Sequence, residues 1–570
     1  MIALPHQLKA ATVLLALSSL LRITGSAGQN GAYTPQEAGE TPPAFKIAGT
    51  VVNAITGAPL ARVRVSLAEP RARAQKIELI TGEGGHFEFA PVPPGKYALQ
   101  GSKGGYITSG YDQHEQFSTA IVTGPQFVTD NLVLRLMPMA MISGHVLDES
   151  GEPVRSANVR LFFDDHGAGM HRVNARNGCT SDDRGYFEFA SLRPGTYFVS
   201  VNAKPWYAVY PHSQAGSDSP PKAPLELNVA YPTTYYGGAT ESESAAPIVL
   251  KGGDHKDIDM RLVPVPALRL VFRVPVEQPA ENQPPQGRGD FANILLQKHV
   301  FNTLDYTRQQ TQMIEPGVFE IVGVPAGRYD VAINSSGVHG MQQQQLGEMN
   351  LTQDGQDLGA AKGEPTATLK VTIKMAEDEP LPKQYFVALR EGRQRIVAGQ
   401  QGDASGQVSI EAIHPGKYGV VIFSSEQRKR YSVIHLSSGP TVFPGREVEL
   451  APGAALEVVA EVAAGEMRID GVVQKNGKPL AGVMVALVPN DPEAHVDLFR
   501  RDQSDFDGTF LLQGVVPGTY TVVAVDDAWG FEWLKAGVLA RYIQHGQEVI
   551  IGEKMRGTLH LPEPVEVQGK

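Results

Sequence analysis

Apolar and polar residues alternate in a short stretch that recurs five times along the chain. Each stretch begins at a glycine, places apolar side chains two, four and seven residues later, and reaches a second glycine after ten residues. A tyrosine stands two positions beyond, and the alternation resumes there. A period of two predicts strands with one buried face. The second glycines and their tyrosines are Gly95 and Tyr97, Gly195 and Tyr197, Gly327 and Tyr329, Gly416 and Tyr418, and Gly518 and Tyr520.

Each stretch predicts a β-hairpin. Proline precedes four of the second glycines, and Ala326 takes its place in the third copy. Proline presets the backbone for the second position of a type II turn, and glycine accepts the positive φ of the third. A hairpin with one apolar face needs further strands to bury that face. We expect the five tyrosines to be framework residues, each with a buried ring and a hydroxyl bonded to nearby backbone.

The spacing of these stretches predicts the domain organisation. Successive second glycines lie 100, 132, 89 and 102 residues apart, in a chain of 570 residues with little helical pattern. A chain of this length is too long for one hydrophobic core. The sequence therefore predicts an all-β protein, a tandem array of five β-sandwich domains. Their predicted bounds are 45–137, 140–264, 267–365, 367–465 and 466–570.

The residues before the first domain predict export. Lys9 precedes an apolar run, and small residues follow it, so we assign 1–27 to a secretory signal peptide. Residues 28–44 are polar and rich in glycine and proline, and we expect a disordered lead-in. No later stretch supplies the roughly eighteen successive apolar residues of a membrane span. We expect a periplasmic or extracellular protein with no transmembrane segment in the mature chain.

The net charge bears on the partners of the protein, and the cysteine content bears on how its domains are stabilised. The formal net charge is −11 and no basic run is present, so we expect no nucleic-acid partner. Cys179 is the single cysteine, which means that no disulfide can form within the chain. Each domain must then be stabilised by its own core. We expect Cys179 to be a small buried or half-buried thiol.

Three of the predicted domains share a longer pattern. In 45–137, 140–264 and 466–570, an Ile-x-Gly-x-Val entry is followed by a Gly-x-Pro turn, an alternating strand and the Pro-Gly stretch. This order resembles the carboxypeptidase regulatory-like domain. The resemblance implies a transthyretin-like, immunoglobulin-like β-sandwich with a carbohydrate-binding-like fold. Domains 267–365 and 367–465 diverge, because they lack the entry and the Gly-x-Pro turn.

The sequence offers no convincing catalytic site. In the family that it resembles, this β-domain accompanies a separate zinc carboxypeptidase domain, and this sequence contains none. His545 and Glu548 have a His-x-x-Glu spacing, but Gly546 favours a turn and only His560 follows. Neither His-Glu-x-x-His, Gly-x-Ser-x-Gly nor a phosphate-binding glycine-rich loop occurs. We predict no catalytic residue, no metal and no cofactor, and therefore a protein that is not an enzyme.

Aromatic clusters on predicted loops are the remaining functional lead. One lies in an insertion at 206–247, and the other follows the last Pro-Gly stretch. Sugar rings pack on flat aromatic side chains, which suggests ligand contacts. The alternative is that the rings cap a sandwich or fill an interface between domains. The candidate ligand-binding residues are Trp206, Tyr207, Tyr210, Tyr231, Tyr235, Tyr236, Trp529 and Trp533.

Three functions follow, in order of preference. The first is a secreted, non-catalytic scaffold or interaction protein of the cell envelope or exterior, with envelope or extracellular proteins as partners. The second is polysaccharide binding through the aromatic loops, which the carbohydrate-binding-like fold of the resembled family implies. The third is an accessory module of a hydrolase or carboxypeptidase, or an unrecognised hydrolase.

Overall fold

The computed structural model describes residues 44–570 apart from a set of short gaps, and Ala44–Lys570 form one compact unit. The predicted signal peptide and nearly all of the predicted lead-in lie outside the described residues. Among the described residues, no helix is long and apolar enough to cross a membrane. The gaps are 70–75, 168, 212, 214–223, 225, 274–291, 302, 308–310, 316, 338–339, 359–365, 377–378, 393–394, 426–429 and 536.

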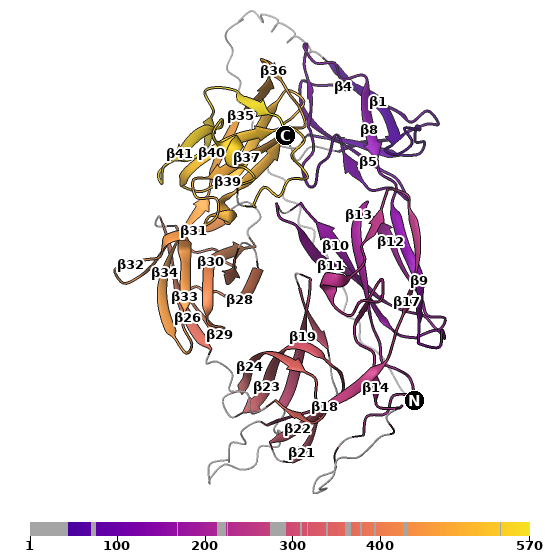
Figure 1. Ribbon diagram of the computed structural model, residues 1–570. Coiled ribbons are helices and arrows are strands. Elements are labelled where there is room, and N and C mark those ends of the chain that lie inside the picture. The colour runs from indigo at the N-terminus through magenta and orange to yellow at the C-terminus, as the bar shows by residue number, and fades with distance from the viewer. Residues whose placement is uncertain are drawn as a thin grey trace, which may run out of the picture. The chain divides into compact units, whose positions relative to one another are not determined.

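Strands make up nearly all of the regular structure of the described residues (Figure 1). The single α-helix among them, α1 (Ala540–Ile543), has four residues. Three short 3-10 segments complete the set, at Ser242–Ser244, Pro444–Arg446 and Val496–Leu498. The predicted all-β fold class is confirmed.

One pattern of strand pairing builds the first sheet pair. Strand β1 (Phe45–Asn53) pairs antiparallel with β4 (His86–Val92) and parallel with β8 (Leu132–Leu136). The other sheet places β2 between β3 and β5, and β5 also pairs with β6 and β7. These strands are β2 (Arg64–Ala68), β3 (Ile77–Ile80), β5 (Gly95–Ser102), β6 (Ser109–Gly110) and β7 (Ile121–Thr123).

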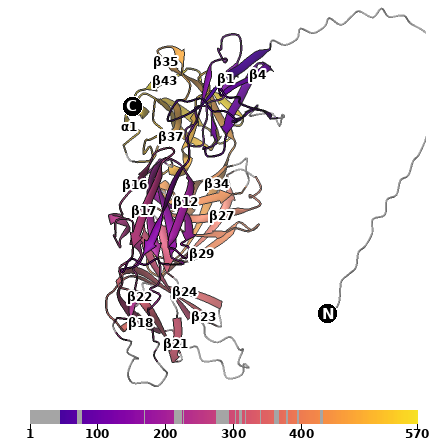
Figure 2. The same cartoon turned by 90° about the vertical axis from the view of Figure 1, so that its right-hand side faces the viewer.

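The second sheet pair repeats this pattern. Strand β9 takes the place of β1 between β12 and β17, while β10 lies between β11 and β13; β12 and β17 are labelled in Figure 2. Cys179 on β11 is half-buried, as predicted. The strands of this part of the chain are β9 (Ala140–Leu147), β10 (Asn158–Asp165), β11 (Arg172–Thr180), β12 (Tyr186–Leu192), β13 (Gly195–Asn202), β14 (Val229–Ala230), β15 (Thr234–Tyr235), β16 (Ile248–Leu250) and β17 (His255–Arg261). Of these, β14 pairs with β18 and so belongs to a sheet of the next set.

The third and fourth sheet pairs keep the same order although their entry motifs differ. Strand β18 pairs antiparallel with β22 and parallel with β25, and β26 pairs in the same two ways with β29 and β34. The third set is β18 (Val265–Arg273), β19 (Ala292–Val300), β20 (Thr303–Thr307), β21 (Thr311–Glu315), β22 (Val318–Pro325), β23 (Gly327–Gly337), β24 (Gly340–Leu351) and β25 (Gln356–Asp357). The fourth set is β26 (Ala367–Met375), β27 (Tyr385–Glu391), β28 (Arg395–Gln401), β29 (Gln407–Ile413), β30 (Gly416–Ser424), β31 (Arg430–Ser438), β32 (Thr441–Val442), β33 (Glu447–Leu450) and β34 (Ala455–Gly465).

The fifth occurrence differs only at its end, where β43 pairs parallel with both β35 and β40 and so joins the two sheets. Its strands are β35 (Met467–Lys475), β36 (Lys478–Pro479), β37 (Met484–Pro489), β38 (Arg500–Gln503), β39 (Thr509–Val515), β40 (Gly518–Val525), β41 (Gln547–Ile551), β42 (Thr558–His560) and β43 (Val565–Gln568). We call the five sets, β1–β8, β9–β17, β18–β25, β26–β34 and β35–β43, copies one to five. Each set surrounds its own cluster of buried apolar residues. The division into five domains with the bounds given above stays a prediction.

The predicted hairpins are wrong. In copy one, β4 belongs to the sheet of β1, whereas β5 belongs to the sheet of β2, so the Pro-Gly turn carries the chain from one sheet to the other. Copies two, three and four do the same. In copy five β39 pairs with β35 and β40 pairs with β37, but β43 joins these strands into one nine-stranded sheet. The predicted type II turn is also wrong at Gly195, Gly327 and Gly518, where φ is 149°, 159° and 154° instead of about 80°. Alternation identifies which face of a strand is buried. The strands before and after the Pro-Gly turn bury their apolar faces in the same core, but from two opposite sheets, so alternation alone could not distinguish this arrangement from a hairpin.

The first glycine of each stretch has the conformation that needs glycine. Its φ is 70° at Gly85 and 77° at Gly508, and the other three copies lie between these values. A Cβ on Gly85 would lie 2.6 Å from the carbonyl oxygen of Val51. Since Val51 N–H donates to the carbonyl of Gly85, this turn is held against the entry strand and any side chain would clash.

The five motif tyrosines have the same environment. All five rings are buried. Each hydroxyl donates to the carbonyl oxygen four residues earlier, over 2.8 to 3.1 Å. The ring therefore fills the core at the crossing between sheets, while the hydroxyl satisfies a carbonyl of the crossing itself.

Candidate functional site: the interface of copy five with copies one and two

The segment after β40 covers the outer face of the second sheet of copy five. Trp533 is 9% exposed and packs with Phe499, Leu534 and Tyr542 in a second apolar cluster, to which Met170 of copy two also contributes. Every residue of β37 is buried, because its two faces contact different clusters. This face of copy five is therefore a packed surface that includes a residue of copy two.

Trp529 contacts copy one. Its ring is stacked on that of His114, with the centroids 5.0 Å apart and the planes at 7°, and the Phe117 ring is 5.7 Å away. The indole N–H donates to the carbonyl of Gly482 over 3.2 Å. The ring is thus enclosed on one face by copy one and tied by its edge to copy five.

Arg501 of β38 lies at the centre of the interface. Its guanidinium donates to both carboxylate oxygens of Glu115, over 2.7 and 3.2 Å, and to the carbonyl of Gly167 over 3.0 Å. It also lies 4.4 Å from the centre of the Trp533 ring. The Arg501 and Glu115 side chains are only 7% and 18% exposed. A bidentate pair at this burial fixes relative geometry as well as charge.

Polar groups extend the interface with copy one. The side-chain amide of Gln503 is buried and donates to the carbonyl of Asp112, over 2.6 Å, and to the Thr119 hydroxyl over 2.8 Å. The ammonium of Lys96 contacts Asp505 at 2.7 Å and Asp507 at 3.3 Å. The buried amide of Gln503 is therefore satisfied across the interface, which is the condition for burying it. The indole N–H of Trp533 is the exception, because it is buried without a hydrogen-bond partner.

Copy five also holds the connection between β10 and β11 of copy two. The backbone N–H of Leu534 donates to the carbonyl of Gly169 over 2.8 Å, and the N–H of His171 donates to Glu532 over 3.0 Å. Gly169 has φ of 80°, and a Cβ there would lie 2.3 Å from the Trp533 ring. Only glycine fits this close approach.

The aromatic residues of the insertion are engaged within the chain. The hydroxyls of Tyr207 and Tyr231 both donate to the Glu149 carboxylate, and that of Tyr210 donates to the carbonyl of Val229 over 2.7 Å. Burial raises the pKa of Tyr210 to about 12. Burial, followed by the hydrogen bond to Glu149 and the charge of that carboxylate, raises the pKa of Tyr207 to about 12 as well. These hydroxyls remain protonated donors at neutral pH.

The remaining candidates divide between buried and exposed. Tyr235 is buried beside Phe301 of copy three, and Tyr236 packs on the core of copy two. Trp206 is 83% exposed. Tyr231, Tyr235 and Trp533 are buried, so they cannot contact a sugar in this structure. The observed positions favour the alternative considered for the rings, that they fill contacts between parts of the chain, for every candidate except Trp206.

Copies four and five meet at a second charged contact. The Arg446 guanidinium is buried and donates to both oxygens of Asp497, over 2.7 and 2.9 Å, and to the carbonyl of Val433. Burial alone would raise the pKa of Asp497, but the hydrogen bonds and charge of Arg446, together with the charge of Arg390, lower it. The ionised form is the one that stabilises this contact.

This pair predicts acid sensitivity. A carboxyl whose pKa is lowered by folding contributes its full stability above its unfolded pKa of about 4 and loses it as the pH falls through the folded value. We therefore expect the melting temperature of copies four and five to fall between about pH 5 and about pH 3 less steeply in Asp497→Asn than in the unaltered chain. Glu457→Gln, which removes an exposed partner of Lys370, is the control. Equal acid slopes for Asp497→Asn and the unaltered chain would contradict the assignment.

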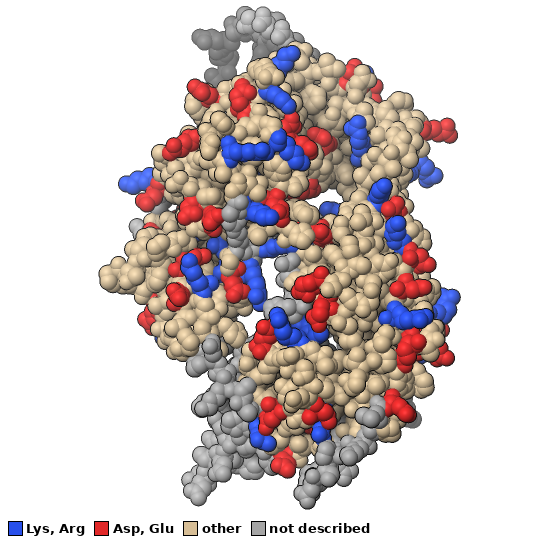
Figure 3. Space-filling model, viewed as in Figure 1, with Lys and Arg blue, Asp and Glu red and all other residues tan. Residues whose placement is uncertain are grey.

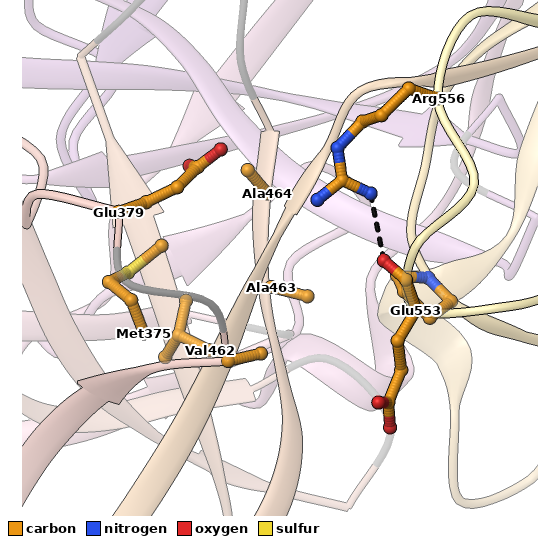
Figure 4. Close-up of a pocket in the computed structure, with 9 residues that line it drawn as sticks. Met375, Glu379, Val462, Ala463, Ala464, Glu553 and Arg556 are labelled. Atoms are coloured by element: carbon orange, nitrogen blue, oxygen red, sulfur yellow. Dashed lines mark hydrogen bonds between the residues drawn. The ribbon is translucent and has the colours of Figure 1, made fainter.

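A pocket lies near the same boundary. Figure 4 shows Glu379 and Arg556 on opposite sides of Ala463 and Ala464, with the Arg556 guanidinium donating to the carbonyl of Glu553 over 2.8 Å. Its volume is about 30 Å³. That is room for one or two water molecules and far below the volume of an organic ligand site.

Charge is mixed on the face drawn in Figure 3. Basic and acidic side chains alternate over it, and among the described residues of that face no basic stripe is visible. A nucleic-acid partner needs such a stripe to neutralise phosphates. This view gives no support to nucleic-acid binding.

Sequence reasoning missed the polar half of the interface. Arg501 and Gln503 belong to a four-residue strand with two adjacent arginines, which reads as a solvent-exposed edge. Glu115 and His114 lie in a polar stretch between two short strands. The one signal of this interface in the sequence was the pair of tryptophans after the last Pro-Gly stretch, and both are among the candidate residues predicted from the sequence.

These features define a multi-domain β-sandwich protein. Residues 46–123 and 141–220 match the family model of the carboxypeptidase regulatory-like domain, so the chain contains two domains of this family, as the resemblance predicted. Residues 466–570 lie outside the matched segments, and their assignment to the family stays a prediction. No curated protein matched the chain.

Several solved structures show limited similarity to the chain. The Bacillus anthracis TIE protein is 11% identical over 74% of this chain and 75% of its own, with a TM-score of 0.17. GBS52, a minor pilin of Streptococcus agalactiae, is 12% identical over 41% of this chain and 100% of its own, with a TM-score of 0.20. A streptococcal ancillary pilin is 10% identical over 55% and 98%, with a TM-score of 0.19. Scores this low carry no argument about function.

Proposed function

We propose that this protein is an exported, non-catalytic scaffold in which copy five docks on copies one and two. The observation that carries the proposal is the bidentate pair between Arg501 and Glu115, nearly buried between residues 386 positions apart. The carbonyl of Gly167 accepts from the same guanidinium, so one side chain connects three copies. Export rests on the signal sequence, and the partners that we propose are envelope or extracellular proteins.

The chemistry of the interface supports a lasting contact. It combines a tryptophan ring held between copies, a charge pair with little exposure, and backbone hydrogen bonds to both copies. Transient contacts between domains are more polar and less well packed than this. Holding sandwiches in a fixed relation is what a scaffold requires.

Hydrogen exchange on the full mature chain tests the proposal. If copy five is docked, the amides of 119–122, 169–173 and 501–504 will be protected together and will lose protection together in Arg501→Ala. Independent exchange of the three segments in the unaltered chain would refute docking. A hydrolytic activity of the purified protein would refute the non-catalytic part.

Polysaccharide binding is the second candidate, because Trp206 presents its ring to solvent. The scaffold proposal predicts that the mature chain is not retained on polysaccharide affinity gels. Trp206→Ala should change the free energy of unfolding by no more than about 0.5 kcal/mol, because an exposed ring has little packing to lose. Trp529→Ala, which empties the space beside His114, serves as the destabilising comparison. Retention that Trp206→Ala abolishes without a change in fold would establish sugar binding instead.

A further inference from the structure

The connection between β10 and β11 brings two imidazoles and a carboxylate together. Asp164 lies near the end of β10, and His166 and His171 lie in the connection that follows. One ligand atom from each residue lies within 4.8 Å of the others. The Oδ1 atom of Asp164 is 3.3 Å from Nε2 of His166 and 2.7 Å from Nε2 of His171.

These contacts are not ordinary hydrogen bonds. Oδ1 of Asp164 is buried and makes no hydrogen bond, although two ring nitrogens lie within ion-pair distance of it, a contact that carries charge only when the imidazoles are protonated. A buried carboxylate oxygen without a partner is costly, and such atoms are rare in folded proteins. Ligands about 2.0 to 2.2 Å from a tetrahedral zinc ion are separated by about 3.3 Å. The Asp164–His166 distance has this value, and the 2.7 Å between Asp164 and His171 is shorter, so the His171 ring would have to move outward by about half an ångström to admit an ion. An ion among the three atoms would satisfy the orphaned oxygen.

We propose that Asp164, His166 and His171 form a binding site for a divalent transition-metal ion, of which Zn²⁺ is the representative. Imidazole nitrogens favour zinc, copper and nickel, whereas calcium and magnesium prefer sets of oxygen ligands. Three protein ligands leave a fourth position for water. The histidine side chains are 47% and 50% exposed, so an ion has a path from solvent.

The neighbouring acid does not belong to the site. Asp165 has other partners, because its Oδ1 accepts from the N–H of Gly167 over 2.9 Å and its Oδ2 contacts Arg176. Glu532 contacts the backbone of His171, not its ring. The ligand set is therefore one carboxylate and two imidazoles.

The site lies on the connection that copy five holds. The carbonyls of Gly167 and Gly169 accept hydrogen bonds from Arg501 and Leu534, and these residues lie between the two histidines. An ion bound by His166 and His171 closes this segment into a short loop and lowers its conformational freedom. Metal binding then preorganises copy two for contact with copy five.

Metal binding by the full mature chain, stripped with a chelator, tests this site. Titration with Zn²⁺ should show one equivalent bound, and Co²⁺ should give the visible absorption of a tetrahedral nitrogen and oxygen site. Asp164→Asn and His171→Ala should each weaken Zn²⁺ affinity by about 100-fold or more, because each removes a ligand directly. His145→Ala is the matched control, since His145 is similarly exposed and lies 3.7 Å from Asp259 without a third ligand.

Three outcomes decide the inference. One equivalent of Zn²⁺ bound by the unaltered chain and by His145→Ala, and lost in both ligand variants, establishes the site. Binding of equal strength in the ligand variants overturns it, because the ion is then held elsewhere. An unaltered chain that shows no stoichiometric Zn²⁺ binding and no Co²⁺ absorption also overturns it, and this result needs no variant to fold.

Discussion

Replacing Arg501 with alanine is expected to release copy five from copies one and two and to cost the docked state about 3 to 5 kcal/mol. The substitution leaves the Glu115 carboxylate largely buried without its cation. It also removes the donor to the carbonyl of Gly167 and the cation beside the Trp533 ring. Removing one partner of a buried pair is costly because the other charge is left without compensation.

Differential scanning calorimetry and hydrogen exchange on the full chain measure this effect. The transition of copy five should move to lower temperature, and protection at 119–122 and 501–504 should fall. Arg395→Ala is the matched control, because Arg395 pairs with Glu391 at an exposed site, where such a pair contributes at most about 1 kcal/mol. Unchanged protection at both segments in Arg501→Ala would show that the pair does not hold the copies together.

A double substitution distinguishes the contribution of the Arg501–Glu115 charge pair from that of the packing of Arg501 on Trp533. If the charge pair accounts for most of the loss, Glu115→Ala combined with Arg501→Ala will cost less than the sum of the single changes, since neither charge is then left alone. If the loss comes from the Arg501 stem and its contact with Trp533, the two effects will add. The double variant therefore identifies which part of the interface stabilises docking.

The local parts of the fold are the parts that the sequence could predict. Strand alternation depends on neighbours two residues apart, and the glycine and tyrosine of each stretch act within a few residues of their own position. The hydroxyl of Tyr197, for example, reaches only to the carbonyl of Arg193. Such short-range requirements leave a signature in the sequence because the same residues must recur wherever the same turn is made.

The choice of strand partner was not predictable in the same way. Residues of β4 and β5 alternate as they would in a hairpin, yet they pair with β1 and β2 in different sheets. Alternation records which face is buried, and two strands facing one core from opposite layers have the same alternation as two neighbours in one sheet. Only long-range pairing distinguishes these arrangements.

The candidate sites depend on contacts between distant segments. Trp529 and Trp533 were located by composition, but their burial depends on His114 and Gly169, which lie in other copies. The metal ligands are close in sequence, as Asp-x-His followed by a second histidine five residues later. This spacing forms a site only when the chain reverses between β10 and β11 so that both rings face Asp164. The sequence contains no motif that predicts a turn of this length.

Tyr520→Ala is expected to lower the stability of copy five by about 3 to 5 kcal/mol. The ring is 1% exposed, in the core between the two sheets, and its removal leaves a cavity that the surrounding strands cannot fill. The hydroxyl also donates to the carbonyl of Val516, over 2.9 Å, within the crossing between sheets. The ring and the hydrogen bond are both lost at the turn where the chain passes from one sheet to the other.

Tyr520→Phe separates the two contributions. It keeps the ring but leaves the carbonyl of Val516 without its donor, so we expect a loss of about 1 to 3 kcal/mol. Tyr186→Ala is the control, because Tyr186 is half-buried on β12 of copy two and its hydroxyl donates to the exposed side chain of Glu188. The calorimetric transition of copy five measures both Tyr520 variants and should be unchanged in Tyr186→Ala. If Tyr520→Phe loses as much as Tyr520→Ala, the hydrogen bond and not the ring sets the stability of the crossing, and the tyrosines recur because of their hydroxyl.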